Sequence, residues 1–378
     1  MDWKIQLFKL NYDEREVEAV ARVVRSSWLT MGEQTKEFES RFAALLGQGA
    51  QATAVSSGTA ALHMAMLALG VGPGDEVIVS SLTFIAAVNV VRLVGARAVL
   101  ADCRSLEDWN IDPADVERKV AAKTRAVIAV HYAGYPCAMD EVEQVCARHR
   151  IALVEDSAHA IGATWRGRQC GTFGTVGCFS FFTNKNLSVG EGGMYVARDP
   201  EFTRRGRMLR SHGMSTLTLD RHEGRAISYD VLEPGLNYRI DELRAALGLV
   251  QLDRLTGANA RRGLLVARYH EQIDRIPGVS IPFRRVPPDV KPCYHIYPVL
   301  LDRGIDRTKV IAGLRNQGIQ SSIHYPAIQR FSAYADTALG ATPIANDVSN
   351  RELTLPLYPG MADSDVDLVC DALKAALA

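Results

Sequence analysis

The sequence lacks the marks of several protein classes. Its seven cysteines are widely spaced and form no Cys-x-x-Cys pair, so they predict buried, reduced thiols rather than a disulfide framework. None of the nine histidines lies in a His-Glu-x-x-His or similar metal-ligand spacing, and we expect no metal site. No apolar run approaches the roughly 20 residues that a transmembrane helix needs, and the N-terminal residues form no apolar signal region. We therefore expect a soluble, cytoplasmic protein.

The sequence also lacks net charge. Lys and Arg together number 43, as do Asp and Glu, so the formal net charge at pH 7 is zero. Proteins that bind nucleic acids or membrane surfaces usually carry an excess of basic residues, so we expect neither kind of partner. The 378 residues, of which 47% are hydrophobic and 23% charged, suffice for one large α/β domain and a smaller one.

Helix and strand patterns alternate between residue 56 and about residue 200. Short apolar strands are expected at 76–80, 98–101, 126–130 and 151–154. Helices are expected at 59–69, 113–120 and 139–149. Asp112 and Pro113 suit the N-cap and the first position of the second of these helices. Strands and helices that alternate at this spacing predict βαβ units and a mainly parallel sheet.

The last third of the chain has shorter elements. Residues 241–276 have a mostly helical pattern, although three glycines in it weaken the case for one continuous helix. After it we expect a strand at 294–301, a helix at 308–316, a strand at 319–324 and a closing helix at 363–377. These elements predict a small α+β domain. We divide the chain into a large domain, residues 1–250, and a small domain, residues 251–378.

A lysine follows an apolar strand and precedes a glycine-rich loop in the segment G-C-F-S-F-F-T-N-K-N-L-S-V-G-E-G-G. Lys185 is the lysine of this segment. A lysine that acts as a Schiff-base nucleophile must lie in a confined site where it can lose its proton. Glycines near it allow the backbone to approach a flat ligand. Taken alone, however, such a lysine is more often a solvated loop residue.

Acidic residues and a histidine end the strand at 151–154. Asp156 lies at the position where a parallel strand presents ligand-binding groups, and His159 follows three residues later. A carboxylate there can keep a pyridinium nitrogen protonated, which makes the ring an electron sink. The alternative is an aspartate that caps the next helix beside a core histidine, and the segment alone does not separate the two.

Two further segments have the residue types that bind a phosphate and a flat ring. Gly58 and Thr59 follow two serines at the start of the helix at 59–69, where free amides and the helix dipole attract anions. Phe84, in S-L-T-F, follows a strand and can stack on a heterocycle. Each has a structural alternative, an ordinary helix cap for the first and a core aromatic for the second.

The order of these segments over about 130 positions carries a resemblance that none of them carries alone. The chain resembles the DegT/DnrJ/EryC1/StrS family of pyridoxal-phosphate-dependent sugar aminotransferases, within fold type I of the aspartate aminotransferase superfamily. The resemblance covers nearly the whole chain. The matching motifs include S-S-G-T-A-A-L, G-P-G-D-E-V-I-V-S, H-Y-A-G-Y-P, E-D-S-A-H-A-I-G-A, F-S-F-F-T-N-K-N-L, G-E-G-G, G-L-N-Y-R-I-D-E-L-R-A-A-L-G, I-H-Y-P and L-P-L-Y-P-G-M.

The resemblance implies a fold, a cofactor and roles for individual residues. The fold would be a large domain with a mainly parallel seven-stranded sheet flanked by helices, plus a small α+β domain. Lys185 would form the Schiff base with pyridoxal 5'-phosphate and act as general acid/base, with pyridoxamine phosphate as the aminated form. The resemblance further implies that Asp156 pairs with the ring nitrogen, that Phe84 stacks on the ring, that His159 lies near its phenolic oxygen, and that Gly58, Thr59 and Ser180 hold the phosphate.

Some of the implied roles concern the substrate and a second subunit. Asn237 would contact the phosphate bound in the neighbouring subunit, so the expected unit is a homodimer with shared active sites. Arg239 and His324 would lie on the substrate side. The expected reaction moves an amino group from L-glutamate to a nucleotide-linked keto sugar, at C4 of a 4-keto-6-deoxyhexose. The alternative acceptors are a keto-cyclitol, a C3-keto sugar or a nonsugar ketone.

Two segments depart from the family pattern on the substrate side. Phe182, Thr183 and Asn184 precede the lysine where the family often has His-Pro or His-Ala, and Gln329 stands where a second histidine is common. The cofactor chemistry is unaffected, but the acceptor is left open. A sugar dehydratase of the same family is disfavoured, because members with that chemistry have histidine in place of the lysine. A DNA-binding protein built on an inactive enzyme fold is disfavoured by the neutral charge.

Overall fold

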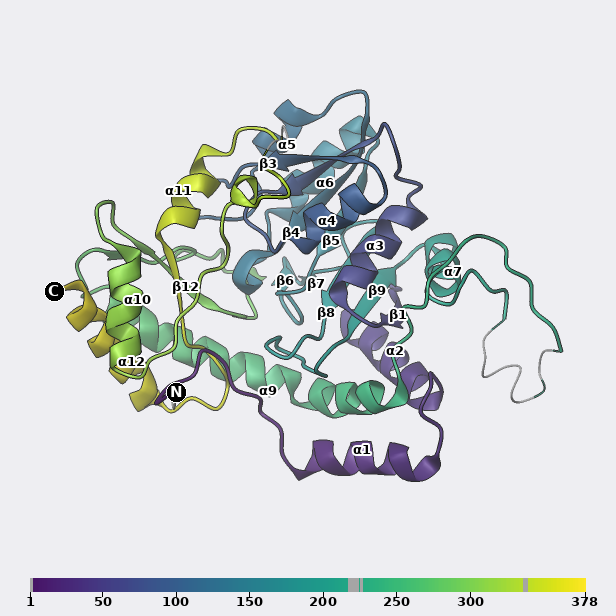
Figure 1. Cartoon of the computed structure of the whole chain (residues 1–378), viewed down its shortest axis with the longest axis horizontal. Helices are drawn as coiled ribbons and strands as arrows, with labels where there is room; N and C mark the ends of the chain where they lie inside the picture. The colour runs from purple at the N-terminus through teal and green to yellow at the C-terminus, as the bar shows by residue number, and fades with distance from the viewer. Residues whose placement is uncertain (1–2, 217–223, 225–226, 336–338) are drawn as a thin grey trace.

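The structure is a computed structural model that describes residues 3–216, 224, 227–335 and 339–378 (Figure 1). The α-helices are α1 (Glu14–Ser26), α2 (Glu33–Leu46), α3 (Gly58–Ala68), α4 (Ala86–Leu93), α5 (Pro113–Lys119), α6 (Met139–His149), α7 (Pro200–Leu209), α9 (Glu242–Ile273), α10 (Arg307–Asn316), α11 (Pro343–Arg351) and α12 (Asp363–Leu377). Short 3-10 turns occupy Tyr132–Gly134 and Ile328–Arg330.

The strands form three sheets. The large sheet contains β1 (Gln51–Val55), β2 (Glu76–Ser80), β3 (Arg97–Ala101), β4 (Thr124–Val130), β5 (Ala152–Asp156), β8 (Val176–Ser180) and β9 (Gly193–Ala197). A second sheet contains β10 (Val279–Ser280), β12 (Tyr297–Leu301) and β13 (Glu352–Leu355), and a third contains β6 (Thr164–Trp165), β7 (Arg168–Gln169) and β11 (Val290–Lys291).

The large sheet has seven strands in the order β1-β9-β8-β5-β4-β2-β3, which confirms the expected mainly parallel, seven-stranded architecture. The pairs from β3 through β8 are parallel, and β9 is antiparallel to both β8 and β1. The carboxyl ends of β2, β4, β5 and β8 therefore meet at one edge. Ligand-binding groups gather at such an edge in open parallel sheets.

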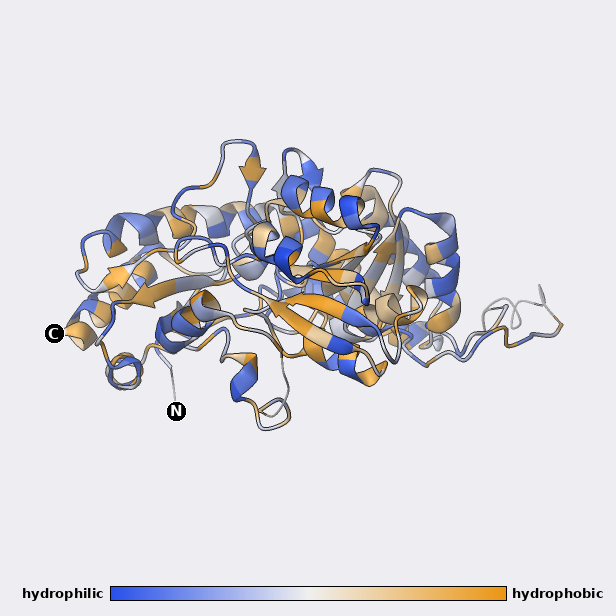
Figure 2. Ribbon diagram, turned by 90° about the horizontal axis from the view of Figure 1, so that it is seen from above, coloured by the Kyte–Doolittle hydropathy of each residue, from blue (hydrophilic) through white to orange (hydrophobic). Residues whose placement is uncertain are grey.

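Alternate residues of the strands enter two different cores on opposite faces of the sheet. Val77 and Val79 of β2 pack with α3 and α4, whereas Ile78 packs on the other face with residues of α5 and α6. This period-2 separation is what a sheet covered by helices on both faces requires. The strands accordingly appear as orange segments inside the molecule in Figure 2, with blue residues on the outer helix faces.

Helix α9 differs from the expectation. It runs without interruption from Glu242 to Ile273, and the residue 250/251 boundary of the predicted domains lies inside it. Gly248 is accommodated because the ring of Phe38 fills the space where a side chain would lie. The first half of α9 packs against α1 and α2, and its second half contributes Leu265 and Tyr269 to a separate core with β12, β13, α10 and α12. The division into two domains stays a prediction.

The strand expected at 319–324 is wrong. Ile319 and Ser322 each make a single bridge, to Ile5 and Thr354 respectively, and no ladder connects them. The segment changes partner between these two residues, so the alternating pattern is not used for one continuous strand. The strand expected at 294–301 begins only at Tyr297, because the backbone amide of His295 donates to the carbonyl of Ala133 instead.

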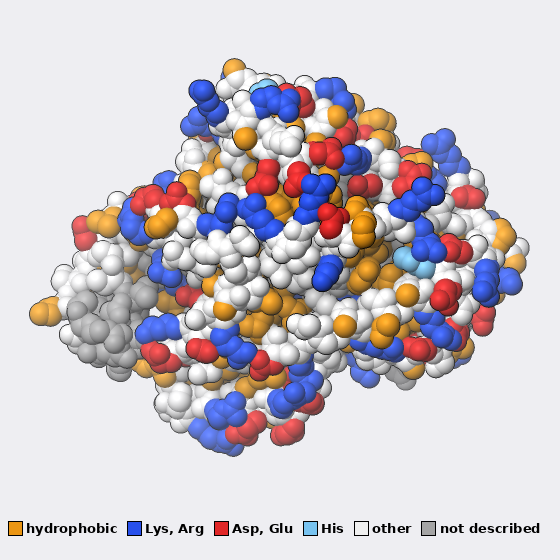
Figure 3. All heavy atoms as spheres, turned by 180° about the vertical axis from the view of Figure 1, so that it is seen from behind, with side chains coloured by type: hydrophobic (Ala, Val, Ile, Leu, Met, Phe, Trp, Pro, Cys, Tyr) orange, Lys and Arg blue, Asp and Glu red, His pale blue; other side chains and the backbone are white. Residues whose placement is uncertain are grey.

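The seven cysteines are free and buried, as expected. Among the described helices, none combines the length and the apolar composition that crossing a bilayer requires. On the face seen in Figure 3, Lys and Arg side chains alternate with Asp and Glu side chains, in agreement with the balanced composition.

Candidate active site

A cavity of about 390 Å³ opens at the carboxyl edge of the large sheet. Its floor includes Val130, Asp156 and Ser180, the last residues of β4, β5 and β8. The predicted residues that line this cavity are Gly58, Thr59, Phe84, Asp156, His159, Ser180, Lys185 and His324. The structure therefore brings together residues that are up to 266 positions apart in the sequence.

The N-terminus of α3 forms one end of the cavity. The hydroxyl of Ser57 caps the helix by accepting a hydrogen bond from the amide of Ala60 at 3.0 Å, while Gly58 and Thr59 face the cavity. A Cβ atom on Gly58 would lie 2.9 Å from that of Ser180, so the absence of a side chain allows α3 and β8 to meet. Helix amides, the dipole and hydroxyl groups at one point fit a phosphate group.

Asp156, the last residue of β5, lies on the floor of the cavity. Asp156 is 7% exposed. Oδ1 accepts from the amide of Ala158 at 3.1 Å, and Oδ2 has no hydrogen-bond partner within the described residues. Burial raises the pKa of Asp156, while the amide of Ala158 and the charge of Lys185 act in the opposite direction. A carboxylate oxygen that faces a cavity without a partner fits the protonated nitrogen of a pyridine ring.

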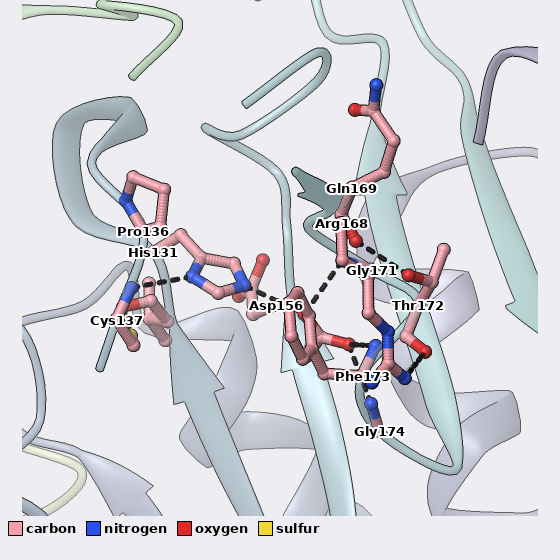
Figure 4. A network of polar contacts seen from close by, with 12 residues as sticks. His131, Pro136, Cys137, Asp156, Arg168, Gln169, Gly171, Thr172, Phe173 and Gly174 are labelled. Atoms are coloured by element: carbon pink, nitrogen blue, oxygen red, sulfur yellow. Dashed lines mark hydrogen bonds and ion pairs between the residues drawn. The ribbon is translucent and has the colours of Figure 1, made fainter. Parts of the chain in front are cut away.

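A buried network holds the strand end that carries Asp156 (Figure 4). The carboxylate of the preceding residue, Glu155, accepts hydrogen bonds at 2.6–2.7 Å from the backbone amides of Gly171, Phe173 and Gly174. It also accepts from Nε2 of His131 at 3.0 Å, because Nδ1 of His131 accepts from the amide of Cys137. His131 and Glu155 are fully buried. They fix the end of β5, and the sequence predicted a role for neither.

Lys185 lies in the loop that follows β8 and lines the cavity. Its side chain is partly buried, and desolvation lowers its pKa to about 8, against the opposing effect of the Asp156 charge. Nζ lies 3.5 Å from Nε2 of His295, a residue that belongs to no quoted motif. A lysine with this pKa is partly neutral at physiological pH, which is the form that attacks a carbonyl group.

His159 is held as a neutral imidazole. Its Nδ1 accepts from the amide of Ala133 at 3.3 Å, so Nε2 carries the hydrogen and donates to the hydroxyl of Tyr325 at 3.0 Å. Burial lowers the pKa of His159 well below its ordinary value, and the nearby Lys185 contributes in the same direction. A fixed hydrogen-bonding ring beside the cavity suits an oxygen substituent of a bound ring.

The outer wall of the cavity is aromatic and open. Phe84 is 56% exposed and Phe182 is 43% exposed. The ring of Phe84 lies 5.8 Å from that of Tyr325. Because Phe84 is exposed at the mouth of the cavity, the alternative of a core aromatic is wrong for this residue.

His324 reaches the cavity from a polar cluster. Its Nδ1 lies 2.9 Å from the Thr354 hydroxyl, and its backbone amide donates to Oε2 of Glu352 at 2.8 Å. The hydroxyl of Thr354 in turn donates to Oε1 of Glu352. Burial raises the pKa of Glu352 to about 8 and lowers that of His324 to about 4.

Asn237 and Arg239 do not line the cavity within one chain. Asn237 is exposed and bridges Ser211, while Arg239 bridges Val55 at the end of β1. The described residues between α7 and α9 extend away from the body of the molecule (Figure 1). The side chain of Asn237 is therefore free to meet another molecule.

The two departures from the family pattern have different surroundings. Phe182 and Asn184 line the cavity, and Asn184 Oδ1 is buried without a hydrogen-bond partner in the described structure. Gln329 does not line the cavity, and its side chain donates to Thr342 at 2.9 Å. Of the two departures from the family pattern, only the segment 182–184 therefore contributes side chains to the cavity.

Comparison with known proteins places this site in context. The sequence profile of the DegT/DnrJ/EryC1/StrS aminotransferase family matches residues 11–374. Over 372 residues the chain is 38% identical to the spore coat polysaccharide biosynthesis protein SpsC of Bacillus subtilis (strain 168), covering 96% of this chain and 94% of that protein.

Solved structures are similar over the same length. The aminotransferase TlmJ from Streptoalloteichus hindustanus superposes with a TM-score of 0.91 at 35% identity and covers 99% of this chain and 98% of its own. Spr1654 of Streptococcus pneumoniae, described as a sugar aminotransferase and solved in its PMP form, superposes with a TM-score of 0.89 at 30% identity and covers 97% of each chain. The same protein is also known in a PLP form.

Proposed function

The chain belongs to the DegT/DnrJ/EryC1/StrS aminotransferase family, and from that premise we propose that it transfers an amino group from L-glutamate to C4 of a nucleotide-linked 4-keto-6-deoxy sugar. The protein is a pyridoxal-phosphate-dependent aminotransferase, and its fold is that of the fold type I enzymes. The observation that carries the proposal is the placement of Lys185 and Asp156 on one cavity at the N-terminus of α3.

Pyridoxal phosphate, when bound, supplies an electron sink and stores the amino group between the two half-reactions. The residues of this chain would hold it in a defined orientation. The N-terminus of α3 and Ser180 would bind the phosphate, and Oδ2 of Asp156 would accept the hydrogen of the ring nitrogen. Phe84 would cover one face of the ring and exclude water from it.

Lys185 would hold and move the proton. With a pKa of about 8, Nζ gains and loses a proton readily near neutral pH. A carboxylate paired with the ring nitrogen must keep its negative charge, whereas burial raises the pKa of Asp156. The amide of Ala158 and the charge of Lys185 lower that pKa and so favour the charged carboxylate.

The proposed acceptor rests on similarity and on the shape of the site. The relative SpsC is named for spore coat polysaccharide biosynthesis, which supports a carbohydrate acceptor. The open mouth of the cavity, with its aromatic wall at Phe84 and Phe182, can admit a large substrate. His324 and Arg239 are the proposed substrate-side residues.

We further propose a cytoplasmic homodimer in which Asn237 reaches the phosphate bound by the partner subunit. Asn237 is exposed and does not line the cavity of its own chain, so its side chain can contact a partner subunit. Sedimentation analysis of the wild type and of Asn237→Ala should both show dimers, while the variant retains pyridoxal phosphate less tightly. Monomeric wild-type protein with full activity would contradict this arrangement.

The acceptor is tested by a panel of nucleotide-linked keto sugars with L-glutamate as donor. We expect a product whose mass corresponds to replacement of a keto oxygen by an amino group on one 4-keto-6-deoxy sugar. C3-keto sugars, keto-cyclitols and simple ketones form the comparison set, because the segment 182–184 departs from the family pattern and so leaves the acceptor open. The protein should lose its yellow colour with glutamate and regain it with the acceptor. A colourless protein that pyridoxal phosphate does not restore would refute the proposal.

A further inference from the structure

His295 is the side chain next to Lys185, and its ring orientation is determined by a chain of hydrogen bonds. It lies between β11 and β12 and is 2% exposed. Nε2 lies 3.5 Å from Nζ of Lys185, and Nδ1 lies 3.0 Å from Oδ1 of Asn186. Which ring nitrogen carries the hydrogen decides whether His295 can accept a hydrogen bond from the lysine.

The orientation of Asn186 answers this question. Its Nδ2 donates to the backbone carbonyl of Cys293 at 2.9 Å and to Oδ1 of Asn259 at 2.8 Å. A carbonyl oxygen only accepts, so the amide group of Asn186 cannot be reversed without loss of these bonds. Its Oδ1 therefore faces His295, and the hydrogen of the ring lies on Nδ1.

Asn259 is oriented in the same way. Its Nδ2 donates to the backbone carbonyl of Ile161 at 3.0 Å, which leaves Oδ1 as the acceptor for Asn186. The relay, defined as Asn259, Asn186 and His295, is thus anchored at two backbone carbonyls that cannot change their role. It connects the middle of α9 to the nucleophile.

The backbone also fixes the position of the ring. The amide of His295 donates to the carbonyl of Ala133 at 2.8 Å. Gly134, at φ +88°, allows this approach, because a Cβ there would lie 2.9 Å from the His295 nitrogen and 2.8 Å from Sγ of Cys293. The H-Y-A-G segment therefore contributes to the site by making room for His295.

We propose that the relay is a positioning device that holds His295 as a neutral hydrogen-bond acceptor for Lys185 and thereby aims the amine into the cavity. With Nδ1–H given to Asn186, the lone pair of Nε2 points to Nζ. This inference rests on the proposed role of Lys185. It assigns functions to His295, Asn186 and Asn259 beyond those proposed above.

Hydrogen bonding to Nε2 of His295 has a measurable consequence for the pKa of Lys185. A neutral lone pair stabilises the ammonium form, so removal of His295 should lower the pKa of Lys185 further. The other titratable groups that line the cavity are Asp156, His159, His324, Tyr325 and Glu191, and Arg262 donates to the backbone carbonyl of His295; all are the same in wild type and variants. A difference between the proteins therefore reports the relay.

The test uses the full-length protein freed of cofactor by hydroxylamine and dialysis. Competitive acetylation with acetic anhydride between pH 6 and pH 10, read by peptide mass spectrometry, gives the titration midpoint of Lys185. We expect His295→Leu to lower the midpoint by about one pH unit. Asn186→Ala, which leaves the imidazole in place but frees its tautomer, should lower it by a smaller amount. His63→Leu, which removes a half-buried histidine bonded to Tyr238, is the matched control and should leave the midpoint unchanged.

A double-mutant cycle separates a relay from unrelated structural damage. If Asn186 acts through His295, the double variant should have the midpoint and the rate of pyridoxal phosphate uptake of His295→Leu alone. The proposal would be overturned if the midpoint shifts of the two single variants added in the double variant. It would also be overturned if wild type and variants all had the same midpoint. If His295→Leu does not fold, as judged by circular dichroism, Asn186→Ala and Asn259→Leu give the same comparison with the histidine retained.

Failure of the relay and failure of the proposed role of Lys185 give different results. Borohydride reduction of the wild-type holoenzyme should fix the cofactor on Lys185. Fixation on another lysine would refute the role of Lys185 and the relay with it. Fixation on Lys185 together with an unchanged midpoint in His295→Leu would refute the relay alone.

Discussion

The two walls of the cavity are built differently. On the inner wall, at the sheet edge, Asp156 and His159 are 7% and 6% exposed, and backbone amides hold both side chains. On the outer wall, Phe84 and Phe182 are about half exposed and pack on little. Contacts within one chain therefore fix the orientation of Asp156 and His159. The outer wall is left for ligands, or a second subunit, to complete.

The largest expected effect comes from removing the nucleophile on the inner wall. Lys185→Ala should abolish transamination, a loss of at least about 1,000-fold. The melting temperature should change little, because Lys185 makes no ion pair within the described residues. Turnover of glutamate and circular dichroism are the measurements. Retention of full turnover by Lys185→Ala would refute the assignment.

The next test concerns the support of the inner wall. Glu155→Gln should lower the free energy of unfolding by about 3 kcal/mol, because the new NH₂ group would face backbone amides that need an acceptor. Glu143→Gln is the control, since Glu143 lies in a partly exposed pair with Arg168 and should change stability by less than about 1 kcal/mol. Urea denaturation measures both. Equal losses of stability in Glu155→Gln and Glu143→Gln would show that the hydrogen bonds of Glu155 do not specially stabilise the inner wall.

A pH experiment tests whether the carboxyl group of Glu352, which accepts from the amide of His324, is as buried as the groups of the inner wall. The pKa of Glu352 is raised to about 8 in the folded protein and is ordinary in the unfolded chain. Between pH 5 and pH 8 the folded state thus holds a proton that the unfolded state has lost, so this group makes stability fall as the pH rises. Glu352→Gln cannot titrate, and its stability should fall less over this range, by about 3 kcal/mol. Parallel curves for wild type and variant would contradict the raised pKa.

The smallest effect is expected on the outer wall. Phe84→Ala should weaken retention of pyridoxal phosphate by about fivefold, in line with the roughly 1 kcal/mol of an aromatic contact. It should leave the free energy of unfolding unchanged, because the ring is 56% exposed. Phe84→Tyr keeps the flat ring and is the matched control. A large loss of stability in Phe84→Ala would remove the distinction between the walls.

The parts of the fold that could be predicted are those with a local pattern. The strands β2, β4 and β5 are short apolar runs, and their parallel direction follows from alternation with helices. The segment 319–324 has a similar local pattern but bridges two different strands, and no local pattern reveals a change of partner. The continuity of α9 depends on Phe38 filling the space above Gly248, which is a tertiary contact.

The same limit applies to the site. Lys185 and Asp156 could be named because they lie in motifs whose residue types match a known chemistry. His295 has no such motif, and only the folded chain places it 3.5 Å from a lysine that is 110 positions away. Glu155 is next to Asp156 in the sequence, yet its function depends on amides of a loop that follows the strand.

Helix α9 has a consequence for how the molecule melts. Its first half is part of the packing around the large sheet, its second half enters the core of β12 and β13, and Asn259 lies between them. Because residues of one helix belong to both cores, unfolding of either core removes packing contacts of α9, which couples the two cores. We therefore expect a single cooperative calorimetric transition, with the calorimetric enthalpy close to the van't Hoff enthalpy and with loss of the visible chromophore at the same temperature.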